Sequence, residues 1–159
     1  MTDVFLGLFS TQKEELPTRC GQMSFLDHVV TNEYSEPVSR LTTSVDLGEC
    51  TASAPRFRAA AIWDTGASSS CISERFAREH DLHPVDTGVG YSASEPMPIS
   101  WYVLDVYLSA DIVIRGLRVA AFPLEKHNID FLIGMDIISR GDLSVRNVHG
   151  KTVVSFEIR

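Results

Sequence analysis

The sequence contains little of what marks several large classes of protein. It has only three cysteines, Cys20, Cys50 and Cys71, an odd number without the close spacing of a zinc site. This small number argues against a disulfide framework and favours a reducing compartment. We therefore expect a cytoplasmic protein. No apolar run approaches the ~20 residues that a membrane-spanning helix needs. Residues 1–9 lack a basic leader and contain Asp3, which makes them a poor signal peptide.

Positive charge is also scarce. The chain has 14 lysines and arginines against 21 aspartates and glutamates, a net charge of −7. This balance argues against binding of nucleic acid through a basic face, and we expect neither a nucleic acid nor a membrane as a partner. The 159 residues, of which 44% are hydrophobic, suffice for one domain with a substantial core.

An apolar run over residues 59–63 ends on a single carboxylate, Asp64, which Thr65, Gly66 and Ala67 follow at once. The apolar residues predict a buried strand, and glycine gives the backbone the freedom for a tight turn after it. A carboxylate at the end of a buried strand is poorly solvated, which is typical of groups used in acid–base chemistry.

For the rest of the chain, the sequence pattern predicts mostly short strands. Alternation of apolar and polar residues predicts strands over residues 40–47, 56–63, 99–108, 143–148 and 152–158, with one or two more between 111 and 124 and a turn at Arg115-Gly116. A short helix is expected over residues 71–82, with Ser73 as its cap, and a helical turn over 135–140, capped by Asp136. The pattern predicts an all-β, barrel-like domain over residues 38–159, preceded by an extension over residues 1–37.

A second segment, Asp130-Phe131-Leu132-Ile133-Gly134-Met135-Asp136-Ile137-Ile138-Ser139, strengthens the interpretation of the first. Together the two segments resemble the catalytic loop and the apolar-apolar-glycine segment of the retropepsin-like aspartic proteases, in particular the bacterial single-domain members. The resemblance covers roughly residues 40–158. It implies a closed β-barrel with one or two short helices that forms a homodimer, with the peptide bound between the subunits beneath flaps.

The resemblance assigns roles to the residues of the first segment. It implies that Asp64 is the catalytic aspartate and that Thr65 hydrogen-bonds across the dimer axis. Gly66 would contact the substrate backbone, and Ala67 completes the supporting loop. Because Ala67 has no hydroxyl that could donate to the carboxylate, we expect an activity optimum at weakly acidic pH. Gly134 would pack under the loop.

The flap should be the hairpin between residues 88 and 97, where the resemblance implies that Tyr91, Ser92 and Ala93 contact the substrate. Related flaps usually carry a glycine near the tip, whereas this chain has Tyr91-Ser92-Ala93-Ser94-Glu95-Pro96.

Peptide hydrolysis without a metal or a covalent intermediate needs one group that takes a proton from water and another that gives one, and two carboxylates that share a proton can do both. One chain supplies only one such carboxylate, Asp64. We therefore expect an aspartic endopeptidase whose second Asp64 comes from another copy of the chain. The unusual flap favours an alternative, a dimeric module that grips an extended peptide without cleaving it. A third hypothesis is a structural β-domain used in assembly, which predicts that Asp64 can be replaced without consequence for the function of the protein.

Several other residues have simpler explanations than a second site. Asp86-Thr87-Gly88 repeats the Asp-Thr-Gly triplet only 22 positions after the first, too close for a second barrel, and its composition predicts a turn. His80, Asp81 and His83 lack further ligands for a metal. Ser68 and Ser69 are expected to stabilise the loop, with Asp136 as a possible partner, and Cys71 to be a small core residue.

Overall fold

The computed structural model describes residues 29–51, 53–92, 95–124 and 128–158. The strands and helices in chain order are β1 (Val29–Tyr34), β2 (Thr42–Glu49), β3 (Phe57–Trp63), β4 (Cys71–Ser73), α1 (Glu74–Glu79), β5 (Asp86–Ser92), β6 (Glu95–Tyr107), β7 (Val113–Phe122), β8 (Phe131–Ile133), α2 (Met135–Ile138), β9 (Gly141–Val148) and β10 (Lys151–Ile158). No helix in these described ranges is long and apolar enough to cross a membrane.

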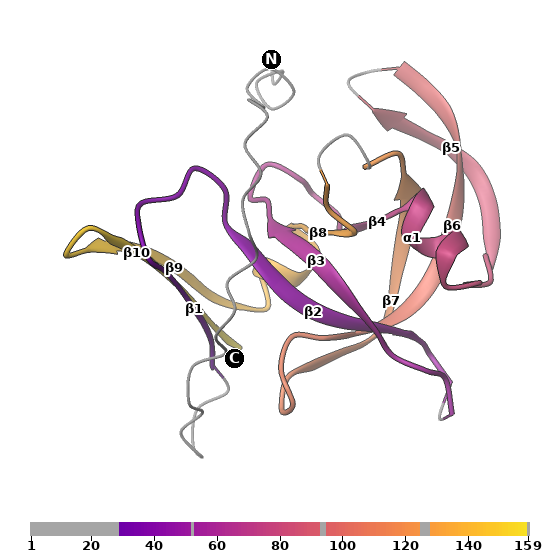
Figure 1. The fold of residues 1–159 in the computed structure, drawn as a ribbon. Coiled ribbons are helices and arrows are strands. Elements are labelled where there is room, and N and C mark those ends of the chain that lie inside the picture. The colour runs from indigo at the N-terminus through magenta and orange to yellow at the C-terminus, as the bar shows by residue number, and fades with distance from the viewer. Residues whose placement is uncertain (1–28, 52, 93–94, 125–127, 159) are drawn as a thin grey trace.

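The larger sheet closes on itself as a barrel (Figure 1). Its strands run in the order β2-β3-β8-β4-β7-β6-β5, and β2 also pairs with β6, so six strands form the ring and β5 extends it as an edge strand. The barrel interior holds fully buried side chains from these strands, among them Leu47, Ile72, Leu104, Val119 and Phe131. The predicted all-β, closed barrel with one or two short helices is confirmed, and the described residues form two.

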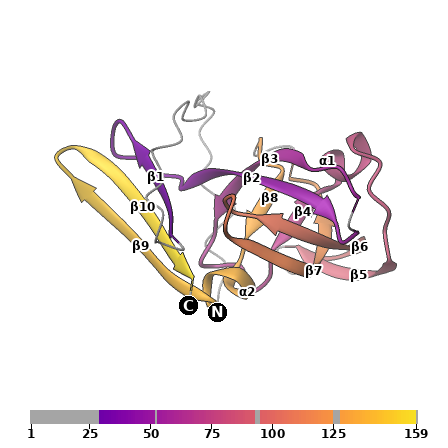
Figure 2. The same cartoon turned by 90° about the horizontal axis from the view of Figure 1, so that it is seen from below.

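A three-stranded sheet, β1-β10-β9, lies beside the barrel, and its long β9–β10 hairpin projects away from it (Figure 2). The two sheets share one core, because Phe156 of β10 is fully buried and its ring lies 5.1 Å from that of Trp63 in β3. β1 belongs to the segment expected to form the extension, and it pairs with β10 from Val29↔Glu157 to Tyr34↔Thr152.

The strand β8 inserts between β3 and β4 and determines where the loop after β3 must run. β8 is parallel to β3 and antiparallel to β4, with Trp63 paired to Ile133 and Cys71 to Leu132. The chain that leaves β3 at Asp64 therefore has to pass over the end of β8 before it returns as β4. This topology brings the loop over residues 64–70 next to Gly134, which follows β8 directly.

Three local predictions are wrong. Residues 71–73 form β4 rather than the start of a helix, because their backbone pairs with β7 and β8, and α1 begins only at Glu74 with Ser73 as its cap. Asp86-Thr87-Gly88 begins β5 instead of forming a turn, since its residues pair with β6. The expected turn at Arg115-Gly116 is an irregularity within β7, where Gly116 has a φ of +62° and its N–H donates to Asp105.

Candidate active site

Asp64 lies at the end of β3 and is buried, with 8% of its surface exposed. Its backbone N–H donates to the carbonyl of Ile133 in β8 at 2.9 Å, which continues the pairing of the two strands to the carboxylate itself. The side-chain Oδ1 accepts a hydrogen bond of 2.8 Å from the N–H of Gly66. The carboxylate is thus fixed between a buried strand and the turn that follows it.

Gly134 lies directly under this loop, as expected from the resemblance. A Cβ added at Gly134 would lie 2.6 Å from the carbonyl carbon of Ser69 and 2.9 Å from the nitrogen of Ser70. These distances are far below van der Waals contact, so the loop can approach β8 this closely only because residue 134 has no side chain. The amide of Met135 then donates to the carbonyl of Ala67 at 2.8 Å.

Ser70 connects the loop to α2, a role that the sequence did not indicate. Its hydroxyl donates to Asp136 at 2.6 Å and accepts from the N–H of Gly134 at 3.0 Å, while its own N–H donates to the Asp136 carboxylate. Asp136 therefore anchors the loop and does not cap α2, whose N-cap is Gly134 without a side-chain hydrogen bond. Ser68 and Ser69, which we expected in this role, are exposed.

Replacing Ser70 with alanine should destabilise the protein by about 1–3 kcal/mol, because it leaves the buried amide of Gly134 without its acceptor and removes the hydroxyl that donates to Asp136. Ser70 is only 2% exposed, so water cannot easily replace the lost hydroxyl. Urea denaturation of Ser70→Ala against the parent measures the change. Ser68→Ala is the matched control, and equal stability losses in both variants would contradict the role of Ser70.

Asp130 lies just before β8, at the end of that strand opposite to Gly134, and holds three elements together there. Its carboxylate accepts from the N–H of Ala60 in β3 at 2.9 Å and from Arg75 in α1 at 2.7 Å. Its backbone carbonyl accepts from the N–H of Ser73 at 2.8 Å. These hydrogen bonds connect β3, β4 and α1 to the start of β8.

Cys71 is a buried neighbour of the carboxylate and not a second nucleophile. Burial, followed by the negative charges of Asp64 and Asp136, raises the pKa of its thiol to about 12. Its burial, with 8% of its surface exposed, confirms the expected role of Cys71 as a small core residue. Trp63, one residue before Asp64, is likewise buried, and its indole N–H has no hydrogen-bond partner among the described residues.

The expected flap is the hairpin of β5 and β6. Gly90 of β5 lies against the side chain of Ile99 in β6, because an added Cβ at Gly90 would lie 2.9 Å from two side-chain atoms of Ile99. Tyr91 is 72% exposed and is therefore free to meet a ligand. Ser92 ends β5, but its side chain and the whole of Ala93 lie outside the described residues.

The remaining candidates from the sequence do not join this site. Asp86 is bound to Arg118 at 2.9 Å on the surface. His80 stacks on Phe57 at 4.1 Å, and Nδ1 of His83 lies 3.0 Å from Glu49, whose pKa is lowered mainly by the backbone N–H of His83. Among the described residues, no three His, Cys, Asp or Glu side chains are grouped so that they could hold a metal ion.

Comparison with known proteins places this geometry in a family. The family model described as aspartyl protease matches residues 50–137, more than half of the chain and including Asp64 and Gly134. A solved structure, the retropepsin-like aspartic protease from Rickettsia conorii, aligns with a TM-score of 0.54 over 87% of this chain and 100% of that chain, at 11% identity. No curated protein matches. The chain belongs to the aspartyl protease family, and its fold is retropepsin-like. Family and fold together support a protease function.

Proposed function

We propose that the protein is an aspartic endopeptidase in which Asp64 from each of two copies activates water against a bound peptide. The observation that carries the proposal is the setting of Asp64: a buried carboxylate at the end of β3, with one oxygen held by the Gly66 amide and the loop supported by Gly134.

The chemistry requires a second carboxylate next to the first. Two carboxylates that lie close together cannot both ionise, so they share a proton, and the pair can take a proton from water and give one to the leaving amine. The only other Asp-Thr-Gly triplet, which starts at Asp86, lies on a surface strand and is bound to Arg118. A two-fold symmetric homodimer supplies the missing group, since each copy presents the same surface to the other.

Within this proposal the exposed residues of the loop have distinct roles. Thr65 and Gly66 are exposed on the single chain, where the partner subunit and the substrate backbone would cover them. Ala67 is half-buried and holds the loop through its carbonyl. Tyr91, with Ser92 and Ala93 beyond it, would close over the peptide. The small, odd set of cysteines favours the cytoplasm as the place of action.

Activity should depend on the dimer. Specific activity should fall as the protein is diluted through its dimer dissociation constant, because a single chain has only one usable carboxylate. Adding excess Asp64→Asn chains to the parent should inhibit it beyond simple dilution, since mixed dimers keep one competent aspartate. Cleavage of a mixed peptide library, read by mass spectrometry beside analytical ultracentrifugation, measures both effects. A fully active monomer would exclude the proposed dyad.

The hairpin supports a second candidate, a dimer that binds an extended peptide without cleaving it. Pro96 and Pro98 of β6 stand opposite Tyr91 and Val89 of β5. Proline fixes φ and donates no backbone hydrogen bond, so this hairpin is stiffer than one with glycine near its tip. Saturable binding of library peptides with no cleavage products at any pH between 4 and 8 would favour this candidate.

A further inference from the structure

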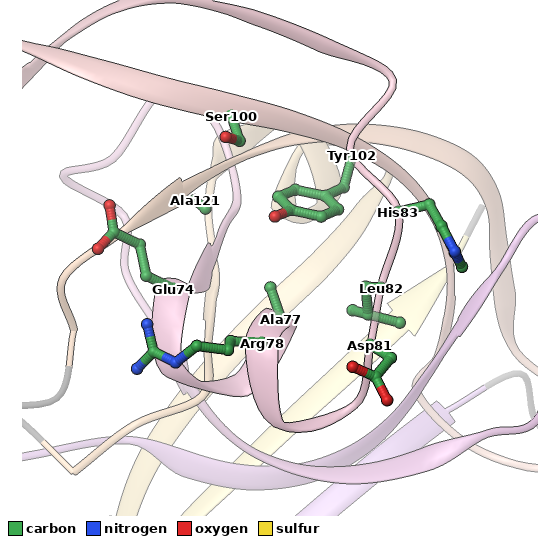
Figure 3. Close-up of a pocket in the computed structure, with 9 residues that line it drawn as sticks. All are labelled: Glu74, Ala77, Arg78, Asp81, Leu82, His83, Ser100, Tyr102 and Ala121. Carbon is green, nitrogen blue, oxygen red and sulfur yellow. The ribbon is translucent and has the colours of Figure 1, made fainter.

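A pocket of about 460 Å³ lies between α1 and the strands β6 and β7, and no residue of the loop over residues 64–70 lines it (Figure 3). Its size falls within the range of small-molecule sites. Two small residues, Ala77 of α1 and Ala121 of β7, are each only 2% exposed and leave the space that larger side chains would fill. Tyr102 and Leu82 complete the apolar part of the wall.

Charged side chains surround this apolar wall. Glu74 and Arg78 are one helical turn apart on α1 and lie at one end of the pocket in Figure 3, whereas Asp81 and His83 lie at the other end. Within the described part of the chain, Glu74, Arg78 and Asp81 form no ion pair. His83 differs, because Glu49 accepts from its backbone N–H at 2.7 Å and lies beside its ring.

The position of Asp81 is set by the backbone. Its φ is +49°, in the left-handed region, which ends α1 and turns the chain, while its N–H still donates to the carbonyl of Arg78. Aspartate and asparagine tolerate this conformation better than most residues. The second carboxylate is thus held at the far end of the pocket from Glu74.

We propose that this pocket binds a free amino acid with a cationic side chain, such as lysine. The α-carboxylate of the ligand would meet Arg78 and its α-ammonium Glu74, since these neighbouring charges match two charges on one carbon. The aliphatic stem would lie against Ala77, Leu82 and Tyr102, and the distal ammonium would reach Asp81. A ligand with a single charge would leave two of the three charged side chains, Glu74, Arg78 and Asp81, without an opposite charge on the ligand, so it should bind more weakly.

Backbone amide shifts of the full-length, ¹⁵N-labelled protein, titrated with L-lysine at pH 7.5, test the proposal. We expect saturable shifts at residues 78–83 and 100–102. L-norleucine, which lacks only the distal ammonium, and Nα-acetyl-L-lysine, which lacks the α-ammonium, should each bind at least about tenfold more weakly, a difference of ~1.4 kcal/mol. Shifts that do not saturate, or equal affinity for all three ligands, would overturn it.

Variants assign the charges to residues. Glu74→Gln, Arg78→Gln and Asp81→Asn should each weaken lysine binding about tenfold, and Asp81→Asn should remove the preference for lysine over norleucine. Glu79→Gln is the matched control, because it lies on α1 but does not line the pocket. Unchanged affinity in all three pocket variants refutes the site. Asp64→Asn should bind lysine normally, so failure here is distinguishable from failure of the protease proposal.

Discussion

Replacing Asp64 with asparagine should abolish peptide cleavage and leave the fold unchanged. The amide cannot share a proton as the carboxylate pair does, and the loss of general acid–base catalysis alone costs roughly 10²–10⁴-fold in rate. The structure should tolerate the change, because the asparagine carbonyl can accept the same hydrogen bond from the Gly66 amide. Product formation from a peptide library, measured by mass spectrometry, gives the rate. Thermal melting and ultracentrifugation show whether fold and dimer persist.

Asp86→Asn is the matched control for this substitution, because Asp86 also precedes Thr-Gly. Its carboxylate is exposed and bound to Arg118, so its loss should leave the rate of cleavage close to that of the parent. Cleavage at the parental rate by Asp64→Asn would contradict the assignment of Asp64 as the catalytic aspartate. A loss of activity in Asp86→Asn as large as that in Asp64→Asn would mean that the wrong triplet had been chosen.

Adding a single methyl group at Gly134 should both destabilise the protein and impair the site. The new Cβ would lie 2.6–2.9 Å from backbone atoms of Ser69 and Ser70. This backbone is hydrogen-bonded to Asp136 and leads directly into β4, so it cannot move aside as a side chain can. Overpacking of this kind costs about 1–3 kcal/mol, and we expect Gly134→Val to exceed Gly134→Ala. Because the displaced segment carries Asp64 and Gly66, kcat should fall even at temperatures where the variant stays folded.

Gly88→Ala is the comparison for Gly134→Ala. Its added Cβ would meet only the indole of Trp101, 3.3 Å from the nitrogen and 3.9 Å from Cδ1, and that side chain can shift. Urea denaturation should therefore show a clearly smaller loss of stability for Gly88→Ala. If Gly134→Ala keeps the parental midpoint and kcat, the loop does not rest on residue 134 as described.

Part of the architecture follows from local sequence alone. The alternation of apolar and polar residues is enough to predict β2 and β10, because alternate side chains of each strand are buried. The same alternation predicts β9, although none of its side chains is fully buried. Ser73 was recognisable as a cap from its position before α1. In contrast, residues 71–73 resemble a helix start, and only pairing with β7 and β8 makes them a strand. Tertiary hydrogen bonds outweighed the local preference there.

The candidate site divides in the same way. The sequence by itself determined that Asp64 ends a buried strand and is followed by a turn, since apolar residues, a carboxylate and a glycine suffice for that inference. Only the tertiary structure decided which side chains anchor the loop. Ser70 meets Asp136 across 66 positions of sequence, and Asp130 reaches Ala60 across 70, because β8 inserts between β3 and β4. Contacts between segments so far apart depend on strand order, which no local pattern encodes.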